Sequence, residues 1–260
     1  MSSKILASLV SDFWRKRNQG IHFPQDWADH ININQAYGIQ LGILDRRIQN
    51  GAELTGWKVG LTSQLMRDQF KVSEPVFGNV VIDGENDGFF SSPQIFDFPN
   101  LIEPSIENEI CFRLNKDLIG PDIKYLDAVS AIAEVIPAIE IPETRGDFTK
   151  QLTLAVADNS QQKAIVLGKP YPYKQTELLG LKAKVYINEQ LVEEGISENV
   201  MGDPVLSLIW LANTLFQFDR SLRKDELIMT GSMTRQVKIQ QGDRVITDFG
   251  HLGIVEAEFR

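Results

Sequence analysis

Three glutamates stand in a sequence context that predicts a cation-binding site. Glu107 and Glu109 are two residues apart in the segment 106–114, whose apolar side chains alternate as in a β-strand. Side chains at that spacing point to the same face, so the two carboxylates lie side by side. Glu140 interrupts the apolar segment 137–141, where an ionised carboxylate is costly unless a cation or hydrogen bonds compensate it. Carboxylate oxygens suit Mg²⁺ or Mn²⁺ better than Zn²⁺. The alternative is a solvated pair of glutamates on the outer face of a strand.

Lys58 is the second residue that could do chemistry. It lies in the apolar segment 54–61, between Gly56 and Gly60, and glycines allow a backbone to approach a ligand closely. A lysine there could pair with a substrate carboxylate, or act as a general base after partial desolvation. The alternative is a lysine whose stem follows a strand edge while its amine reaches water.

Three polar residues, Asp158, Asn159 and Ser160, follow the apolar run 154–157. These residue types are typical of a turn or a helix cap, and the same side chains could hold a water molecule or substrate oxygens. Arg145 is interpreted as an ordinary surface ion-pair partner. The sequence has no phosphate-binding glycine loop, no Gly-x-Ser-x-Gly elbow and no dinucleotide-binding fingerprint.

Composition limits the class of protein. The 260 residues are 43% hydrophobic and 23% charged, which is ordinary for a globular chain of one large or two modest domains. The formal net charge of −9, without a long basic run, argues against binding to nucleic acid or to an anionic membrane surface. The one cysteine, Cys111, excludes an intrachain disulfide and fits a reducing compartment. Because no signal peptide or transmembrane segment is recognisable, we expect a cytoplasmic protein.

The periodicity of the apolar residues predicts an α+β architecture. A helical N-terminal region is expected over residues 1–55 and a β-rich body over residues 56–260. Helices are predicted at 3–18, 34–50, 64–70, 127–136 and 205–216, the last one after the start signal Gly202-Asp203-Pro204. Strands are predicted at 54–61, 106–114, 164–167 and 183–187, and four more follow between 227 and 259. The state of residues 149–157 stays open.

Several segments match a family pattern in the same order along the chain. They are Gly56 to Ser63 (GxKxGLTS), Glu107 to Phe112 (ExEIxF), Pro137 to Ile141 with Arg145 (PALEI…R), Ala157 to Gly168 (ADNxxxxxVLG), Gly202 to Pro204, Trp210 to Asn213 and Gly231 to Thr234. The chain thereby resembles the 2-keto-4-pentenoate hydratase and 4-oxalocrotonate decarboxylase family of the fumarylacetoacetate hydrolase superfamily. The resemblance implies a fumarylacetoacetate hydrolase-like, mixed β-rich core with a small helical N-terminal region.

The resemblance also implies a lyase that needs a divalent metal. Mg²⁺ or Mn²⁺ would be bound by Glu107, Glu109 and Glu140, and a small 2-oxo acid substrate would chelate the metal through its carboxylate and keto oxygens. The metal would act as a Lewis acid and stabilise an enolate. A hydratase would use the enolate to add water at C5, whereas a decarboxylase would let it take up the electron pair released by CO₂.

The remaining roles are also implied residue by residue. Lys58 would neutralise the substrate carboxylate or move the proton, with Asp158 and Ser160 in the same catalytic group. The backbone at Gly60 and Leu61, together with the Ser160 hydroxyl, would orient the substrate. The family further suggests a homo-oligomer.

One position departs from the hydratase pattern. Hydratases of the family commonly carry an acidic residue where this chain has Val76, and an apolar residue there is more like the decarboxylase branch. The segment 231–235 is more like the hydratase branch. The resemblance favours a hydratase of aromatic-compound catabolism. The alternatives are a 4-oxalocrotonate-type decarboxylase with the same site and a non-catalytic relative that keeps the fold as a binding module.

Overall fold

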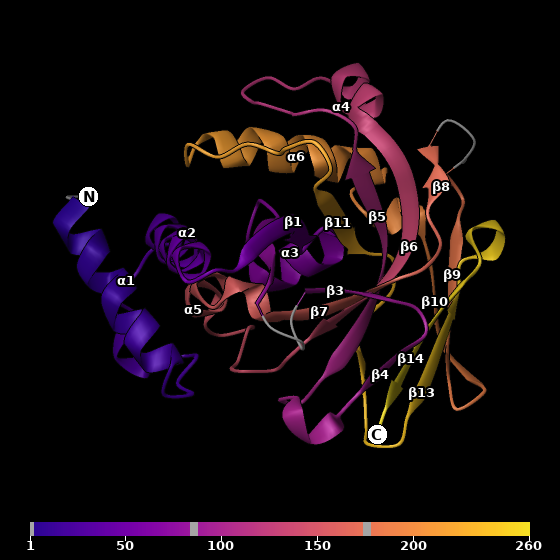
Figure 1. The fold of residues 1–260 in the computed structure, drawn as a ribbon, viewed down its shortest axis with the longest axis horizontal. Helices are drawn as coiled ribbons and strands as arrows, with labels where there is room; N and C mark the ends of the chain where they lie inside the picture. The colour runs from indigo at the N-terminus through magenta and orange to yellow at the C-terminus, as the bar shows by residue number, and fades with distance from the viewer. Residues whose placement is uncertain (1–2, 84–87, 174–177) are drawn as a thin grey trace.

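The chain begins with two helices that pack closely against each other at the N-terminal side of the molecule (Figure 1). The computed structural model describes residues 3–83, 88–173 and 178–260. Helix α1 spans Ser3–Arg17 and helix α2 spans Ile33–Gln49. Gly42 of α2 allows this close approach because it has no side chain. A Cβ atom there would lie only 2.5 Å from the Val10 side chain of α1.

Two sheets form the body of the protein. The nine-stranded sheet has the order β2-β1-β11-β5-β6-β7-β3, with β12 paired to β5 and β8 paired to β6. Its strands are β1 (Glu53–Gly60), β2 (Val76–Ile82), β3 (Gly88–Ser91), β5 (Ser105–Leu114), β6 (Ile132–Pro142), β7 (Gln162–Leu167), β8 (Tyr171–Pro172), β11 (Leu227–Ser232) and β12 (Val237–Lys238). The five-stranded sheet has the order β10-β9-β13-β14-β4. Its strands are β4 (Gln94–Phe96), β9 (Lys182–Ile187), β10 (Gln190–Ile196), β13 (Arg244–Asp248) and β14 (Ile254–Phe259).

Among the described residues, four further α-helices connect or cover the strands (Figure 1). They are α3 (Gln64–Phe70), α4 (Tyr125–Ala131), α5 (Leu152–Ala157) and α6 (Pro204–Phe216). The Asp203 side chain caps α6 by accepting a hydrogen bond from the backbone N–H of Val205, as the start signal predicts. Helix α5 settles the state of the second half of 149–157. No helix in the described ranges is long and apolar enough to cross a membrane.

The predicted helix over 127–136 is wrong in its second half. Helix α4 ends at Ala131, and β6 begins at the next residue. Val135 and Ile136 pair with Phe112 and Cys111 of β5. A β-branched pair that is buried between strands therefore overrides the helical periodicity of the local sequence.

Both faces of the nine-stranded sheet are buried near its centre. One face packs on the main core, which also holds residues of α1 and α2 such as Phe13 and Leu44. The opposite face holds a second apolar cluster made of Val80, Cys111, Ile136, Ala138, Ile165, Leu227 and Met229. Cys111 is thus a core residue. Helices precede β1 and strands dominate after it, while the boundary of the predicted division at residue 55 stays a prediction.

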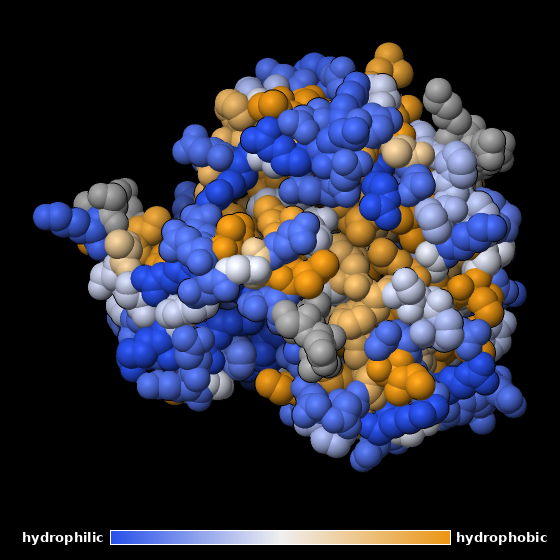
Figure 2. All heavy atoms as spheres, viewed as in Figure 1, coloured by the Kyte–Doolittle hydropathy of each residue, from blue (hydrophilic) through white to orange (hydrophobic). Residues whose placement is uncertain are grey.

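The outer surface is mostly hydrophilic in the view of Figure 2, with apolar side chains gathered toward the middle of that face. Hydrophilic side chains also predominate over the two N-terminal helices on this face. This distribution agrees with a chain whose charged residues are largely solvated.

Glu226, which precedes β11, leads to a prediction about stability and pH. Burial raises the pKa of Glu226 to about 7, although Trp57 Nε1 and the Arg223 N–H donate hydrogen bonds to its carboxylate. The folded protein therefore holds a proton that the unfolded chain releases above about pH 4.5. Stability should fall as pH rises from about 4.5 to about 7, by up to about 3 kcal/mol from this group.

Glu226→Gln should remove that slope because glutamine keeps an acceptor oxygen without the charge. Urea unfolding at pH 5 and pH 8 should show a gain in the variant's stability at pH 8 only. Glu53→Gln, at an exposed position, serves as the control. Equal stability of Glu226→Gln and the wild type at pH 8 would contradict the prediction.

Candidate metal and catalytic site

Three glutamates from two neighbouring strands meet inside the nine-stranded sheet. Glu107 of β5 pairs in register with Glu140 of β6, and Glu109 lies two residues further on the same face of β5. Each glutamate offers a carboxylate oxygen, and these oxygens lie within 4.8 Å of one another. Glu109 and Glu140 are both 0% exposed. The structure therefore brings together the three residues that the sequence predicts as metal ligands.

Three carboxylate oxygens in this cluster lack a hydrogen-bond donor among the described residues. Glu109 Oε1 and both carboxylate oxygens of Glu140 have no hydrogen-bond partner there. Glu140 Oε1 does lie 3.2 Å from Lys58 Nζ, an ion-pair distance. The pair lacks hydrogen-bond geometry, so the contact between Lys58 and Glu140 is electrostatic. Buried acceptors of this kind fit a hard divalent cation, which binds through oxygen ligands.

The electrostatics of the cluster also fit a cation. Burial and the negative charge of Glu140 together raise the pKa of Glu107 to about 7, although Lys58 opposes the rise. Burial and the charges of Glu140 and Glu107 hold the pKa of Glu109 well above its usual range. Three ionised carboxylates would thus repel one another in a dry site, and a divalent cation would relieve both the repulsion and the lost hydration.

Lys58 of β1 provides the positive charge in this cluster. Its side chain is buried, and it pairs with Gly78 of β2 and Met229 of β11 across the sheet. Burial alone would lower the pKa of Lys58, but the neighbouring glutamates, Glu140 first, raise it above the usual lysine value. In the metal-free protein Lys58 is therefore an ammonium, and the alternative of a lysine that reaches water along a strand edge is wrong.

A backbone donor holds one of the three predicted metal ligands in place. The N–H of Gly231 donates a 2.8 Å hydrogen bond to Glu109 Oε2. Gly231 has φ +115°, and a Cβ atom there would lie 2.4 Å from the Thr62 side chain. Only glycine fits this position, at a break in the register of β11 with β5. Sequence reasoning assigned no role to Gly231, although the segment 231–234 was part of the family pattern.

The predicted substrate-binding backbone lies beside Lys58. A Cβ atom on Gly60 would lie 3.7 Å from Lys58 Nζ and 3.3 Å from Val76 Cγ2. The next residue, Leu61, has the left-handed φ of 55°. Arg67 of α3 holds this turn by donating hydrogen bonds to the carbonyls of Leu61 and Thr62. The roles of Gly60 and Leu61 toward a substrate stay predictions.

Ser160 lies in a backbone conformation that is rare for residues other than glycine. Asn159, Ser160 and Gln161 have successive φ values of 63°, 50° and 61°. Each such residue costs about 1 kcal/mol or more, so surrounding contacts must hold the turn. The Ser160 hydroxyl donates a 3.2 Å hydrogen bond to the Phe77 carbonyl, which leaves its oxygen able to accept.

Asp158 belongs to a different cluster of charges. Its Oδ1 accepts from Arg17 Nη1 at 2.9 Å and lies 3.3 Å from His22 Nδ1, and its Oδ2 accepts from Arg145 Nε at 2.5 Å. Although burial would raise the pKa of Asp158, Arg145 and the other partners hold it below its usual value. These contacts are with Arg17, His22 and Arg145 and not with Lys58, so the catalytic role of Asp158 stays a prediction.

The interpretation of Arg145 as a surface residue is wrong. Its side chain is 3% exposed, and it also forms a 2.9 Å ion pair with Glu143. Arg17 and His22 were missed as partners of Asp158 because nothing in their local sequence connects them to a residue 136 or more positions away.

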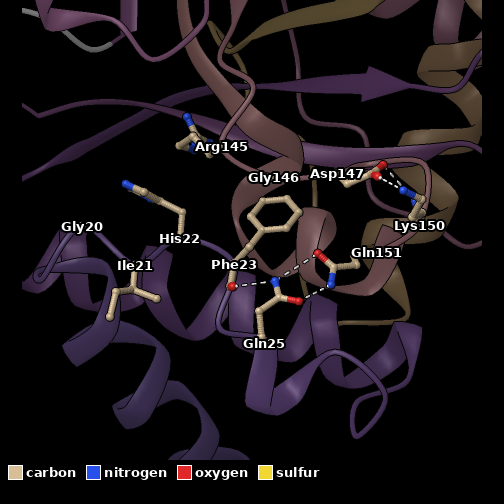
Figure 3. A pocket seen from close by; sticks show the side chains of 10 residues that line it. All are labelled: Gly20, Ile21, His22, Phe23, Gln25, Arg145, Gly146, Asp147, Lys150 and Gln151. Carbon is tan, nitrogen blue, oxygen red and sulfur yellow. Dashed lines mark hydrogen bonds and ion pairs between the residues drawn. The ribbon is translucent and has the colours of Figure 1, made fainter.

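A cavity of about 640 Å³ lies next to the Asp158 cluster rather than at the glutamates (Figure 3). Its lining includes His22, Phe23, Arg145 and Lys150. Gln25 and Gln151 face each other across its lower side and hydrogen-bond to one another. None of the three clustered glutamates lines this cavity. The three glutamates, in contrast, combine burial, the spacing of metal ligands and the nearby Lys58.

Comparison with known proteins supports the resemblance. No protein-family model matches the chain. The chain is 31% identical to 2-oxo-hept-4-ene-1,7-dioate hydratase of Escherichia coli over 98% of its length and 97% of that protein. It is 32% identical to 4-oxalocrotonate decarboxylase of Pseudomonas putida, over 92% of its length and 90% of that protein.

Solved structures give the same answer. The structure of 4-oxalocrotonate decarboxylase from Pseudomonas putida G7, complexed with magnesium and adipate, matches with a TM-score of 0.91 and 26% identity, over 100% of this chain and 99% of that one. Fumarylpyruvate hydrolase from Pseudomonas aeruginosa shares the fold, with a TM-score of 0.62 and 13% identity over 80% of this chain and 89% of that one. The chain therefore belongs to the 2-keto-4-pentenoate hydratase and 4-oxalocrotonate decarboxylase family, and its fold is that of the fumarylacetoacetate hydrolase-like structures.

Proposed function

We propose that this protein is a divalent-cation-dependent lyase that hydrates a small 2-hydroxy-dienoate or 2-oxo-enoate in the breakdown of aromatic-type compounds. The observation that carries the proposal is the buried cluster of Glu107, Glu109 and Glu140 with Lys58 beside it. Support comes from relatives named as hydratases of 2-oxo-hept-4-ene-1,7-dioate and of 2-hydroxyhexa-2,4-dienoate. We further propose that the protein is cytoplasmic and homo-oligomeric, as expected from the sequence.

Glu107, Glu109 and Glu140 would hold the cation, which we propose to be Mg²⁺ or Mn²⁺. Solved relatives contain magnesium or calcium, and a more distant one contains Mn²⁺. When bound, the cation supplies Lewis acidity that favours negative charge on the oxygen of a 2-oxo group. The Gly231 N–H keeps Glu109 aimed into the cluster while the other oxygens remain available.

Lys58 would move the proton. A cation on the glutamates would offset their attraction for the ammonium and bring the pKa of Lys58 down, so that the amine can accept and return a proton. The backbone of Gly60 and Leu61 and the acceptor oxygen of Ser160 would orient the substrate near this amine. Burial of the site excludes bulk water, which strengthens each of these interactions.

Decarboxylation is the second candidate, and Val76 favours it. Its side chain is buried, and its Cγ2 and Lys58 Nζ both border the space beside Gly60. An apolar wall cannot activate a water molecule, whereas it is compatible with loss of CO₂ from a 2-oxo acid. A non-catalytic relative is disfavoured because a scaffold has no need for three buried carboxylates around a buried lysine.

A paired assay of the purified protein with Mg²⁺ tests the two reactions. Ultraviolet absorbance follows the loss of 2-hydroxypenta-2,4-dienoate, and CO₂ release follows the turnover of 2-oxohex-3-enedioate. Water addition without CO₂ release would support hydration, and CO₂ release alone would establish the decarboxylase alternative. If neither substrate reacts while Mg²⁺ binds, the proposed hydration is wrong for these substrates.

Val76→Asp should raise the ratio of hydration to decarboxylation about tenfold, because it adds a carboxylate near Lys58 that can position a water molecule. The paired assay measures this ratio. Val76→Ala is the matched control, since it vacates the same space without adding an acid. A ratio that changes equally in both variants would contradict a role for the acid.

A further inference from the structure

The strained turn 159–161 lies directly behind the strand that neighbours Lys58. Asn159 Oδ1 accepts a 2.7 Å hydrogen bond from the N–H of Asn79, and Asn159 Nδ2 donates to the Asn79 carbonyl at 2.8 Å. Ser160 holds the carbonyl of Phe77, two residues earlier on β2. The turn therefore grips β2 on both sides of Gly78.

Gly78 transmits this contact to Lys58. It pairs with Lys58 in the register of β1 with β2. A Cβ atom on Gly78 would lie 3.0 Å from the Asn159 carbonyl oxygen and 3.3 Å from Lys58 Cγ. The Asn159 carbonyl and the Lys58 stem therefore border the same small space beside Gly78. In a closely packed interior, a shift of the turn would change the wall near which Lys58 lies.

The residue before the turn is anchored by the N-terminal region. Asp158 is held by Arg17, at the end of α1, and by His22, in the loop that follows. Arg145 holds both its carboxylate and its carbonyl from the other side. Figure 3 shows His22 and Arg145 approaching each other from these two segments. Three left-handed residues in a row require such external support, because their own backbone disfavours the conformation.

We propose that Arg17 and His22 are positioning residues for Lys58, acting through Asp158 and the turn 159–161. The helical N-terminal region thereby sets the geometry of a site to which it contributes no ligand among the described residues. The effect on turnover rests on the proposed function, whereas the effect on the turn does not. Asp158 on this view orders the turn and is not required to touch the substrate.

The test measures amide hydrogen exchange and turnover in Arg17→Gln. Exchange at the Asn79 N–H should be at least about tenfold faster, since the opening of the turn becomes easier when its anchor loses a cation. Exchange in β13 and β14 should be unchanged, which separates a local effect from general loosening. Turnover should fall about tenfold through kcat, while the midpoint of the Mg²⁺ titration followed by thermal shift stays within about twofold.

Matched variants sharpen the result. Arg15→Gln removes an ion pair with Asp12 on the same helix and should change neither readout. Arg17→Lys should keep most of the exchange protection at Asn79 and most of the turnover, because it keeps a cation opposite Asp158. The double variant Arg17→Gln with His22→Asn should show faster exchange at Asn79 and lower turnover than the single variant.

Two outcomes would overturn the proposal, and a third would overturn the proposed function. Unchanged exchange at Asn79 in the double variant would overturn the proposal, as would faster exchange with unchanged kcat. Faster exchange in a protein whose wild type turns over no 2-oxo acid would support the link to β2 and overturn the proposed function instead.

Discussion

Glu140→Gln should abolish the stabilisation of this protein by Mg²⁺. A ligand present at about 100 times its Kd stabilises the folded state by about 2.7 kcal/mol, which corresponds to a rise in Tm of several degrees for a chain of this size. Glutamine at position 140 leaves two carboxylates and removes the charge that pairs with Lys58. We expect the Kd for Mg²⁺ to rise at least about 100-fold. Mutation of residues that only support metal ligands already weakens metal binding about 10- to 100-fold, and loss of a ligand should weaken it more. Thermal unfolding at a series of Mg²⁺ concentrations measures the effect.

The matched control for this variant lies on the same strand. Glu134 of β6 pairs with Arg113 at 2.7 Å and is 34% exposed, so Glu134→Gln removes a carboxylate outside the cluster. It should leave the Mg²⁺-dependent rise in Tm intact. A full Mg²⁺ effect in Glu140→Gln would show that the three glutamates do not form a metal site.

The stability of Glu140→Gln without Mg²⁺ provides a second test of the metal site. Glu140 is a cause of the raised pKa of both Glu107 and Glu109, so its neutralisation relieves repulsion in the absence of a cation. The variant should therefore lose much less stability without Mg²⁺ than with it. A residue that merely packs would instead cause the same loss of stability with and without Mg²⁺, so the difference identifies a metal ligand.

The glutamate cluster could be predicted from the sequence because strand periodicity is local. The alternation over 106–114 places Glu107 and Glu109 on one face without knowledge of any partner. Glu140 required only its apolar surroundings. What the pattern could not give is the pairing of Glu107 with Glu140, which is set by the register of β5 with β6.

The Asp158 cluster shows where local reasoning ends. Arg17 is the last residue of an amphipathic helix, and its spacing predicts a solvated position. Its contact with Asp158 spans 141 positions and exists only because α1 and the body share a core. Likewise, a turn or cap at 158–160 was expected from its polar residues. The left-handed backbone of 159–161 and its hold on β2 follow from tertiary contacts.

Lys58→Met should lower kcat about 10²- to 10⁴-fold while Mg²⁺ binding is kept, because general acid–base catalysis contributes on that scale. Methionine fills a similar volume in the sheet and removes only the amine. Without Mg²⁺ the variant should be less stable than the wild type by about 3–5 kcal/mol, since breaking a buried ion pair leaves carboxylates without a counter-charge. With Mg²⁺ much of this loss should disappear.

The Mg²⁺-dependent rise in Tm should consequently be larger in Lys58→Met than in the wild type, the reverse of Glu140→Gln. Lys184→Met, which removes a half-exposed lysine of β9 that lies 3.7 Å from Glu194, should change neither Tm nor turnover appreciably. Turnover of Lys58→Met within a few-fold of the wild type would exclude Lys58 as the proton carrier. If the larger Mg²⁺ effect persisted in that variant, Lys58 would be a counter-charge that keeps the metal-free site folded, and the proton would have to move through another group.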